Sequence, residues 1–129
     1  MTNIYVTNES NYPISTTNIK KRLGDFLTNR GVAANREVGV SVVGKKIMID
    51  LAKKYLKEEE VLHNVLTFSE SEITGKFMYP SGQRESLGEI IVCYPKIFEE
   101  AKGENKQVDD KLYELIEHGA RHLLGEHHE

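Results

Sequence analysis

The chain contains five histidines, and four of them fall within its last twelve residues. His118 and His122 are four residues apart, so on a helix both imidazoles leave the same side, one turn from each other. That spacing lets two ring nitrogens reach one zinc ion at about 2.0–2.1 Å. Gly125 can turn the chain back after the helix, so that His128, or its neighbour His127, supplies a third ligand. Three protein ligands leave a fourth position for water, as in catalytic zinc sites. The pattern predicts one divalent metal ion per chain, with zinc the first choice.

Two simpler interpretations of the same residues stay open at this point. Histidines four residues apart also occur on helices that bind nothing, and a surface cluster of histidines can hold a metal adventitiously.

Leu115 lies one turn before the histidine pair on the same side of the expected helix. We therefore expect the pair at the edge of the buried helix face, in a partly dry pocket.

Hydrophobic patterning predicts the elements that position this segment. Strands are expected over residues 3–7, 38–42, 61–68 and 90–93, where β-branched and apolar residues alternate or run together. Helices are expected from Ser15 or Thr16 to Gly31, after Gly44 through Tyr55, around Pro95 as far as Gly103, and from about Gln107 to Leu124. The stretch from Ser69 to about Leu87 is expected to be irregular, and loops of that length often serve as lids or binding loops.

The order of these elements predicts an α+β (mixed α/β) fold. We expect a single domain over residues 1–129, with one mixed sheet of about four strands packed with about four to five helices. No interdomain linker or internal repeat interrupts the chain.

Composition narrows the environment and the classes of partner. No apolar run reaches the roughly 20 residues of a membrane helix, and the N-terminus lacks a signal-like start, so we expect no membrane association. One cysteine, Cys93, excludes an intrachain disulfide, and its apolar surroundings suggest a small buried hydrophobe in a reduced, cytoplasmic protein. The net charge of −3 gives no support to nonspecific coating of nucleic acid. Lys20, Lys21 and Arg22 are interpreted as a solvated helix face.

The histidine segment also resembles a family signature. His118-Gly119, His122-Leu123 and Gly125 followed by His128 resemble the HGxLHLxGxDH pattern of the YbeY family of metal-dependent endoribonucleases. Two upstream segments add to the resemblance: residues 64–68 look like the family's [TN]-[DN]-V-L-S-F strand, and residues 87–90 look like its L-G-D-I strand. The matched order spans roughly residues 37 to 128.

The resemblance implies a mixed α/β fold in which His118, His122 and His128 hold zinc. It implies hydrolysis of phosphodiester bonds in single-stranded RNA, in the 3′-end maturation of 16S rRNA and in ribosome quality control, with rRNA and the small ribosomal subunit as partners. Glu89 stands at the family's acidic position, where it could orient a metal ligand or move protons. Its alternative interpretation is a solvated glutamate at the start of a strand.

This sequence departs from the family pattern at several positions. Arg121 stands where the family has leucine, and Glu126 and His127 replace an aromatic residue and an aspartate. Ser69 replaces a proline, Leu56 replaces an arginine, and Ser41 occupies the position of an arginine that is functional in some relatives.

Two competing functions follow from the same residues. The histidine spacing also fits the metzincin pattern H-E-x-x-H-x-x-G-x-x-H of zinc peptidases, but Gly119 occupies the position of the general-base glutamate and cannot accept a proton. The departures from the family pattern favour a second alternative, a ribosome- or RNA-binding module of the same fold with weakened catalysis.

Overall fold

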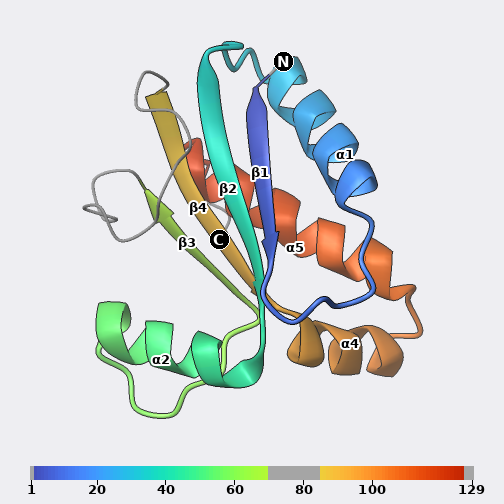
Figure 1. Ribbon diagram of the computed structural model, residues 1–129, viewed down its shortest axis with the longest axis vertical. Helices are drawn as coiled ribbons and strands as arrows, with labels where there is room; N and C mark the ends of the chain where they lie inside the picture. Colours follow the sequence, from blue (N-terminus) through green and yellow to red (C-terminus); the bar gives the residue numbers. More distant parts are fainter. Residues whose placement is uncertain (1, 70–84, 127–129) are drawn as a thin grey trace.

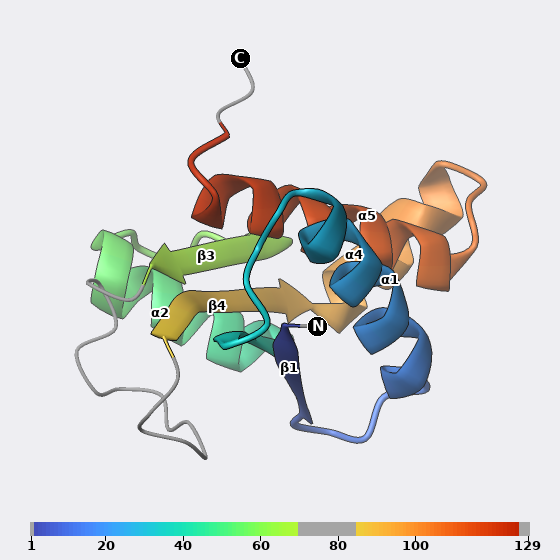
Figure 2. The same ribbon diagram turned by 90° about the horizontal axis from the view of Figure 1, so that it is seen from above.

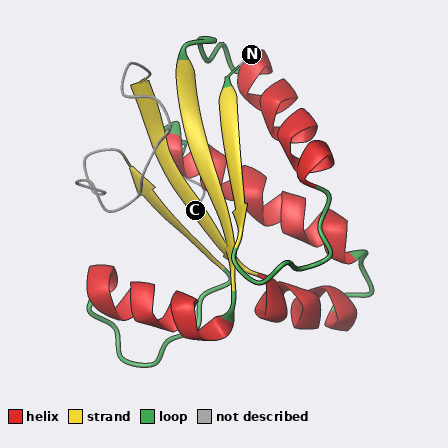
Figure 3. Ribbon diagram, viewed as in Figure 1, coloured by secondary structure: helices red, strands yellow, loops and turns green. Residues whose placement is uncertain are grey.

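A mixed four-stranded sheet forms the centre of the computed structural model, which describes residues 2–69 and 85–126. Its strand order is β1-β2-β4-β3 (Figures 1 and 3). β2 (Arg36–Val43) pairs in parallel with β1 (Asn3–Asn8) on one side and with β4 (Glu85–Cys93) on the other. β3 (Val65–Ser69) runs antiparallel to β4 at the edge of the sheet. The expected α+β architecture is therefore confirmed.

Helices cover the sheet unequally. The described residues form four of them: α1 (Thr16–Asn29), α2 (Lys45–Leu56), α4 (Tyr94–Gly103) and α5 (Val108–Leu123). The larger apolar cluster joins α1, α4 and α5 to one face of the sheet, and a smaller cluster joins α2 to the other face. Seen from above, α5 lies on one side of β3 and β4, and α2 extends toward the other (Figure 2). None of the helices within these described ranges is long and apolar enough to cross a membrane.

Strand alternation decides which side chains meet which layer. In β2, Val38, Val40 and Val42 belong to the larger cluster, together with Ile90 and Val92 of β4. The intervening residues of both strands therefore face the side of α2, because successive side chains of a strand point to opposite faces. This alternation determines the surroundings of every candidate residue on the sheet.

Local signals at the helix ends agree with the sequence. The Ser15 hydroxyl accepts a hydrogen bond from the Asn18 N–H at 3.2 Å and caps α1. Pro95 occupies the first turn of α4, where its missing N–H is not needed. Gly125, with φ +82°, follows the end of α5.

Two expected boundaries were wrong. The extended piece expected over residues 61–68 forms a strand only over Val65–Ser69, with residues 61–64 as a connection that leads into it. β4 begins at Glu85 rather than near Ile90. Most of the expected irregular stretch, residues 70–84, lies outside the described residues.

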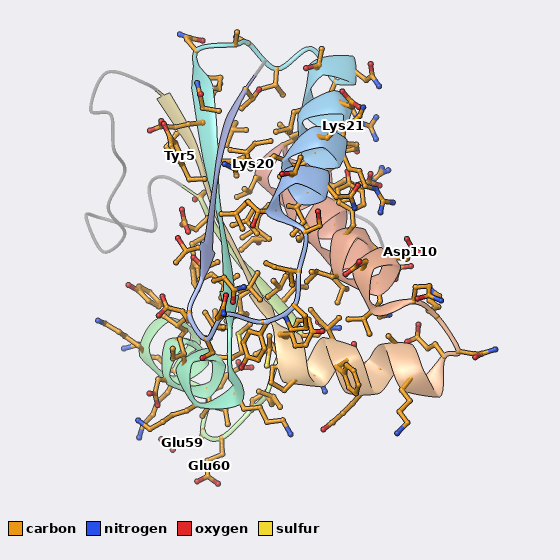
Figure 4. The ribbon with its side chains drawn as sticks, turned by 45° about the vertical axis from the view of Figure 1, so that its right-hand side comes forward. Tyr5, Lys20, Lys21, Glu59, Glu60 and Asp110 are labelled. Atoms are coloured by element: carbon orange, nitrogen blue, oxygen red, sulfur yellow. The ribbon has the colours of Figure 1, made fainter. Side chains whose placement is uncertain are left out.

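The lysines of α1 occupy the position that the sequence suggested. Lys20 and Lys21 are exposed on this helix (Figure 4), and Lys21 pairs with Asp25 at 3.3 Å on the same helix. Nothing in these contacts assigns them a binding role.

Candidate metal centre

The last helix presents two histidine rings to one point in space. The Nε2 atoms of His118 and His122 lie 3.1 Å apart, and the ring centroids are separated by 4.6 Å at nearly perpendicular orientation. Both residues are exposed. The one-turn spacing on α5 places both rings on the same side of the helix, where they converge.

Gly119 brings this part of α5 unusually close to the sheet. A Cβ atom at Gly119 would lie 2.8 Å from Thr67 Cγ2 and 2.9 Å from Ile90 Cγ2. A similar contact occurs at Gly88 of β4, where φ is +138° and an added Cβ would lie 2.9 Å from Leu123 Cδ2. The two glycines therefore allow the C-terminal half of α5 to pack directly on β3 and β4.

This close packing gives the histidine pair a wall. A cavity of about 200 Å³ is lined by Val65, Leu66 and Thr67 of β3 and by both histidines. The expected position at the edge of the buried helix face is thus observed. Gly119 and Ala120, which lie between the two exposed histidines in the sequence, are both buried. Whether the pocket is partly dry stays a prediction.

The donor set fits zinc. In a tetrahedral site with Zn–N bonds of about 2.0–2.1 Å, two ligand nitrogens stand roughly 3.3 Å apart. The observed 3.1 Å between the two Nε2 atoms is close to this separation. The same distance also suits a hydrogen bond between two neutral imidazoles of different tautomers. Imidazole nitrogens in this arrangement are donors that zinc prefers.

A third ligand is not found in the described part of the chain. Within residues 2–69 and 85–126, no group of three or more histidine, cysteine, aspartate or glutamate side chains is arranged to hold a metal ion. Both candidates for the third ligand, His128 and the alternative His127, lie outside the described residues. Their role stays a prediction.

The structure does not bring Glu89 to the histidine pair. Ile90 contacts Gly119 of α5, so its neighbour Glu89 points to the opposite face of the sheet. There the Glu89 carboxylate lies over Gly39, so closely that a Cβ atom added at Gly39 would overlap it. The carboxylate also accepts a hydrogen bond from the Ser41 hydroxyl at 3.4 Å. A role in orienting His118 or His122 does not fit this placement.

The alternative interpretation of Glu89 as a solvated glutamate does not fit either, because the residue is only 5% exposed. Glu89 lines a separate cavity of about 230 Å³ together with Tyr5 of β1, which is labelled in Figure 4, and with Ile47 and Leu51 of α2. Sequence reasoning missed this placement, because Glu89 precedes a continuous apolar run that does not reveal its face.

The end of α5 carries a polar network that the sequence did not predict. The Arg121 guanidinium donates to Glu117 at 3.2 Å and to Glu126 at 3.5 Å. Glu117 also accepts a hydrogen bond from the Tyr113 hydroxyl at 3.1 Å. Burial, and then the nearby Glu117 carboxylate, raise the pKa of Tyr113 well above its usual range. The only available signal was the i, i+4 spacing of Tyr113, Glu117 and Arg121.

The expected burial of Cys93 is confirmed. Its side chain is 0% exposed and belongs to the cluster under α2. Burial raises the pKa of the thiol, with smaller opposing contributions from a backbone hydrogen bond and from Lys45 and Lys96. A neutral buried thiol is neither a ready nucleophile nor a ready metal ligand.

Comparison with a known structure shows the fold first. The solution structure of TM1509 from Thermotoga maritima superposes with a TM-score of 0.59 and 23% identity, covering 98% of this chain and 75% of that one. The fold of this chain is therefore shared with that protein.

Comparison of sequences then gives the family. The profile described as Endoribonuclease YbeY matches residues 5–129. An endoribonuclease YbeY of Dehalococcoides mccartyi is 31% identical over 124 residues, which cover 90% of this chain and 72% of the relative. One from Francisella philomiragia is 25% identical over 131 residues, covering 98% and 78%. The chain belongs to the YbeY endoribonuclease family, a family of RNA-cleaving hydrolases.

Proposed function

We propose that this endoribonuclease is zinc-dependent and cuts single-stranded RNA, acting in the cytoplasm in 16S rRNA 3′-end maturation and ribosome quality control on the small subunit. The main support for the zinc site is the 3.1 Å distance between the Nε2 atoms of His118 and His122, in a cavity that residues of β3 line on one side. Family membership supports RNA as the substrate.

The roles of the residues follow from this arrangement. His118 and His122 would hold the ion, and His128 or His127 would complete the set. A bound zinc ion would supply a Lewis acid for a phosphoryl oxygen and lower the pKa of a coordinated water. Because both rings are exposed, a phosphodiester of a large substrate can approach them. The residues of β3 close one side of the cavity and restrict approach to the other.

The peptidase alternative gains no support from the geometry. A metzincin needs a glutamate directly after its first histidine to act as general base. Here that residue is Gly119, which faces Thr67 and Ile90 with too little room even for a Cβ atom. A glutamate at this position could not reach a water in the histidine cavity.

The alternative of a module with weakened catalysis is favoured by one observation. Arg121 and Glu126 differ from the family pattern and contact each other directly beside the histidine pair. A ribosome-binding module predicts association with the small subunit and intact RNA. Cleavage by the zinc-loaded protein distinguishes the two hypotheses.

The test uses the purified chain, its zinc content and a labelled single-stranded RNA. We expect stoichiometric zinc, cleavage that a chelator abolishes and added zinc restores, and loss of both zinc and cleavage in His118→Ala and His122→Ala. His63→Ala is the matched control, since the His63 ring pairs with Glu58 and is not among the residues that line the histidine cavity. Substoichiometric zinc in the wild type after growth with zinc would refute the metal site.

His127→Ala and His128→Ala, measured side by side, identify the third ligand. Loss of zinc in only one of them assigns the role. Retention of full zinc affinity in both, and in the double variant, would refute a third histidine ligand. A matching double-stranded RNA tests the proposed preference for single strands, which equal cleavage of both would contradict.

A further inference from the structure

The wall of the histidine cavity carries a hydroxyl group. Besides the two histidines, the cavity is lined by Val65, Leu66 and Thr67 of β3. Leu66 belongs to the apolar cluster under α2, so Val65 and Thr67 face α5, because successive side chains of a strand point to opposite faces. Val65 packs at the margin of the larger apolar cluster. Among the lining residues that the structure describes, Thr67 is therefore the one that adds a polar side chain to the two imidazoles.

The methyl group of Thr67 fixes the direction of its hydroxyl. The Cγ2 atom lies against α5, where a Cβ atom added at Gly119 would come within 2.8 Å of it. Both branches leave the same Cβ atom and χ1 of threonine is stiff, so the seat of the methyl group determines where the hydroxyl points. With the methyl group turned to Gly119, the hydroxyl is the branch left to line the cavity.

This hydroxyl is available to a ligand. Thr67 is half-buried, and within residues 2–69 and 85–126 its hydroxyl makes no hydrogen bond to a protein group. A threonine hydroxyl can donate one hydrogen bond and carries no charge. It therefore offers a donor beside the histidine pair without repelling a cation held there.

We propose that the Thr67 hydroxyl donates a hydrogen bond to a non-bridging phosphoryl oxygen of RNA bound at the histidine pair. This role rests on the proposed function, because it takes the scissile phosphodiester to bind beside His118 and His122. Attack on phosphorus adds negative charge to the non-bridging oxygens. A donor already held beside them stabilises the transition state more than it stabilises the bound substrate.

The expected size of the effect follows from the charge of the acceptor. Hydrogen bonds to charged groups are stronger than those between neutral groups. Loss of one that is made in the transition state should slow cleavage about 10- to 100-fold. Since the bond strengthens during the reaction, the loss should appear mainly in kcat and less in KM.

Two substitutions divide the Thr67 side chain into its parts. Thr67→Val keeps a methyl group toward Gly119 and removes the hydroxyl, so kcat should fall while zinc content and the free energy of unfolding stay unchanged. Thr67→Ser keeps the hydroxyl and loses the methyl group, and it should retain most of the activity. A purely structural role predicts the reverse order. Thr7→Val is the matched control, because Thr7 is an exposed threonine of β1 that lines a different cavity.

The experiment measures cleavage of a labelled single-stranded RNA by the zinc-loaded protein, first with the natural substrate. Sulfur then replaces one or the other non-bridging oxygen of the linkage that the wild type cuts. Because sulfur accepts hydrogen bonds poorly, the diastereomer with sulfur facing Thr67 should be cut more slowly by the wild type. In Thr67→Val this slowing should shrink for that diastereomer alone.

Wild-type kcat in Thr67→Val overturns the role of this hydroxyl, as do sulfur effects that are the same in Thr67→Val and the wild type for both diastereomers. Loss of zinc from Thr67→Val together with cleavage also overturns it, since the side chain would then act on the metal site. Cleavage that persists in His118→Ala refutes the proposed function instead, and with it the site at which Thr67 acts.

Discussion

Gly119→Ala tests the close contact between α5 and the sheet. The added methyl would lie 2.8 Å from Thr67 Cγ2 and 2.9 Å from Ile90 Cγ2. Both of these atoms belong to β-branched side chains, which have stiff χ1 angles and cannot rotate away easily. The helix must therefore move outward or the sheet must deform.

The magnitude follows from two opposing effects. Replacing glycine by alanine inside a helix stabilises it by about 1 kcal/mol. Overpacking a well-packed core costs about 1–3 kcal/mol, and two contacts below 3.0 Å on stiff neighbours argue for the upper part of that range. The net expectation is a loss of about 1–2 kcal/mol in the free energy of unfolding.

Urea unfolding followed by circular dichroism measures this change, and Gly103→Ala provides the control. Gly103 is the last residue of α4, and an added Cβ there would meet nothing within 4 Å. That variant should gain about 0.5–1 kcal/mol. In the double variant Thr67→Ser/Gly119→Ala, one of the two clashing methyl groups is absent. The double variant should therefore be more stable than Gly119→Ala alone. If Gly119→Ala is as stable as Gly103→Ala, the reasoning about direct packing fails.

Three further predictions concern other parts of the molecule. Cys93 should react with a thiol reagent only in denaturant, since the thiol is buried and its pKa is raised; rapid reaction of the native protein would contradict this. Hydrogen bonding to Lys111 lowers the pKa of Glu104 in the folded protein. The pair therefore stabilises the fold at pH values above the unfolded pKa of about 4.3. This stabilisation is lost as the pH falls through the lowered pKa of the folded state. Lys111→Met should therefore reduce the difference between the melting temperatures at neutral and acidic pH, and an unchanged difference would refute the link. Ser15→Ala should cost about 1 kcal/mol in urea unfolding, against no change for Ser10→Ala, because it removes the N-cap of α1.

Periodicity predicted the helices well, because each buries a stripe that the sequence displays. In α5, Leu112 and Leu115 are buried and Val108 and Leu123 pack at the margin of the same cluster, as their spacing indicated. The convergence of His118 and His122 was predictable for a similar reason, since their i, i+4 spacing places both rings on one side of the helix.

Relations between elements could not be predicted in this way. The face on which Glu89 lies depends on strand pairing, which sets Glu89 opposite Gly39 and Phe68. The short strand β3 begins beside the end of β4, where the Cys93 N–H donates to the Asn64 carbonyl at 3.0 Å. The sequence does not mark this start, because residues 61–64 are as apolar in pattern as the strand that follows. Likewise, the contact of Arg30 with Glu126 joins residues far apart in the chain, and nothing in their local sequence marks it.

The contact between Gly39 and Glu89 also constrains how this sequence can evolve. An added Cβ at residue 39 would overlap the Glu89 carboxylate, which accepts a hydrogen bond from Ser41. A larger residue at position 39 therefore requires the flexible end of the Glu89 side chain to turn away from Ser41, or a shorter residue at position 89. The two positions should covary among descendants of this chain, with glycine at 39 accompanying glutamate at 89 and larger residues accompanying a smaller partner.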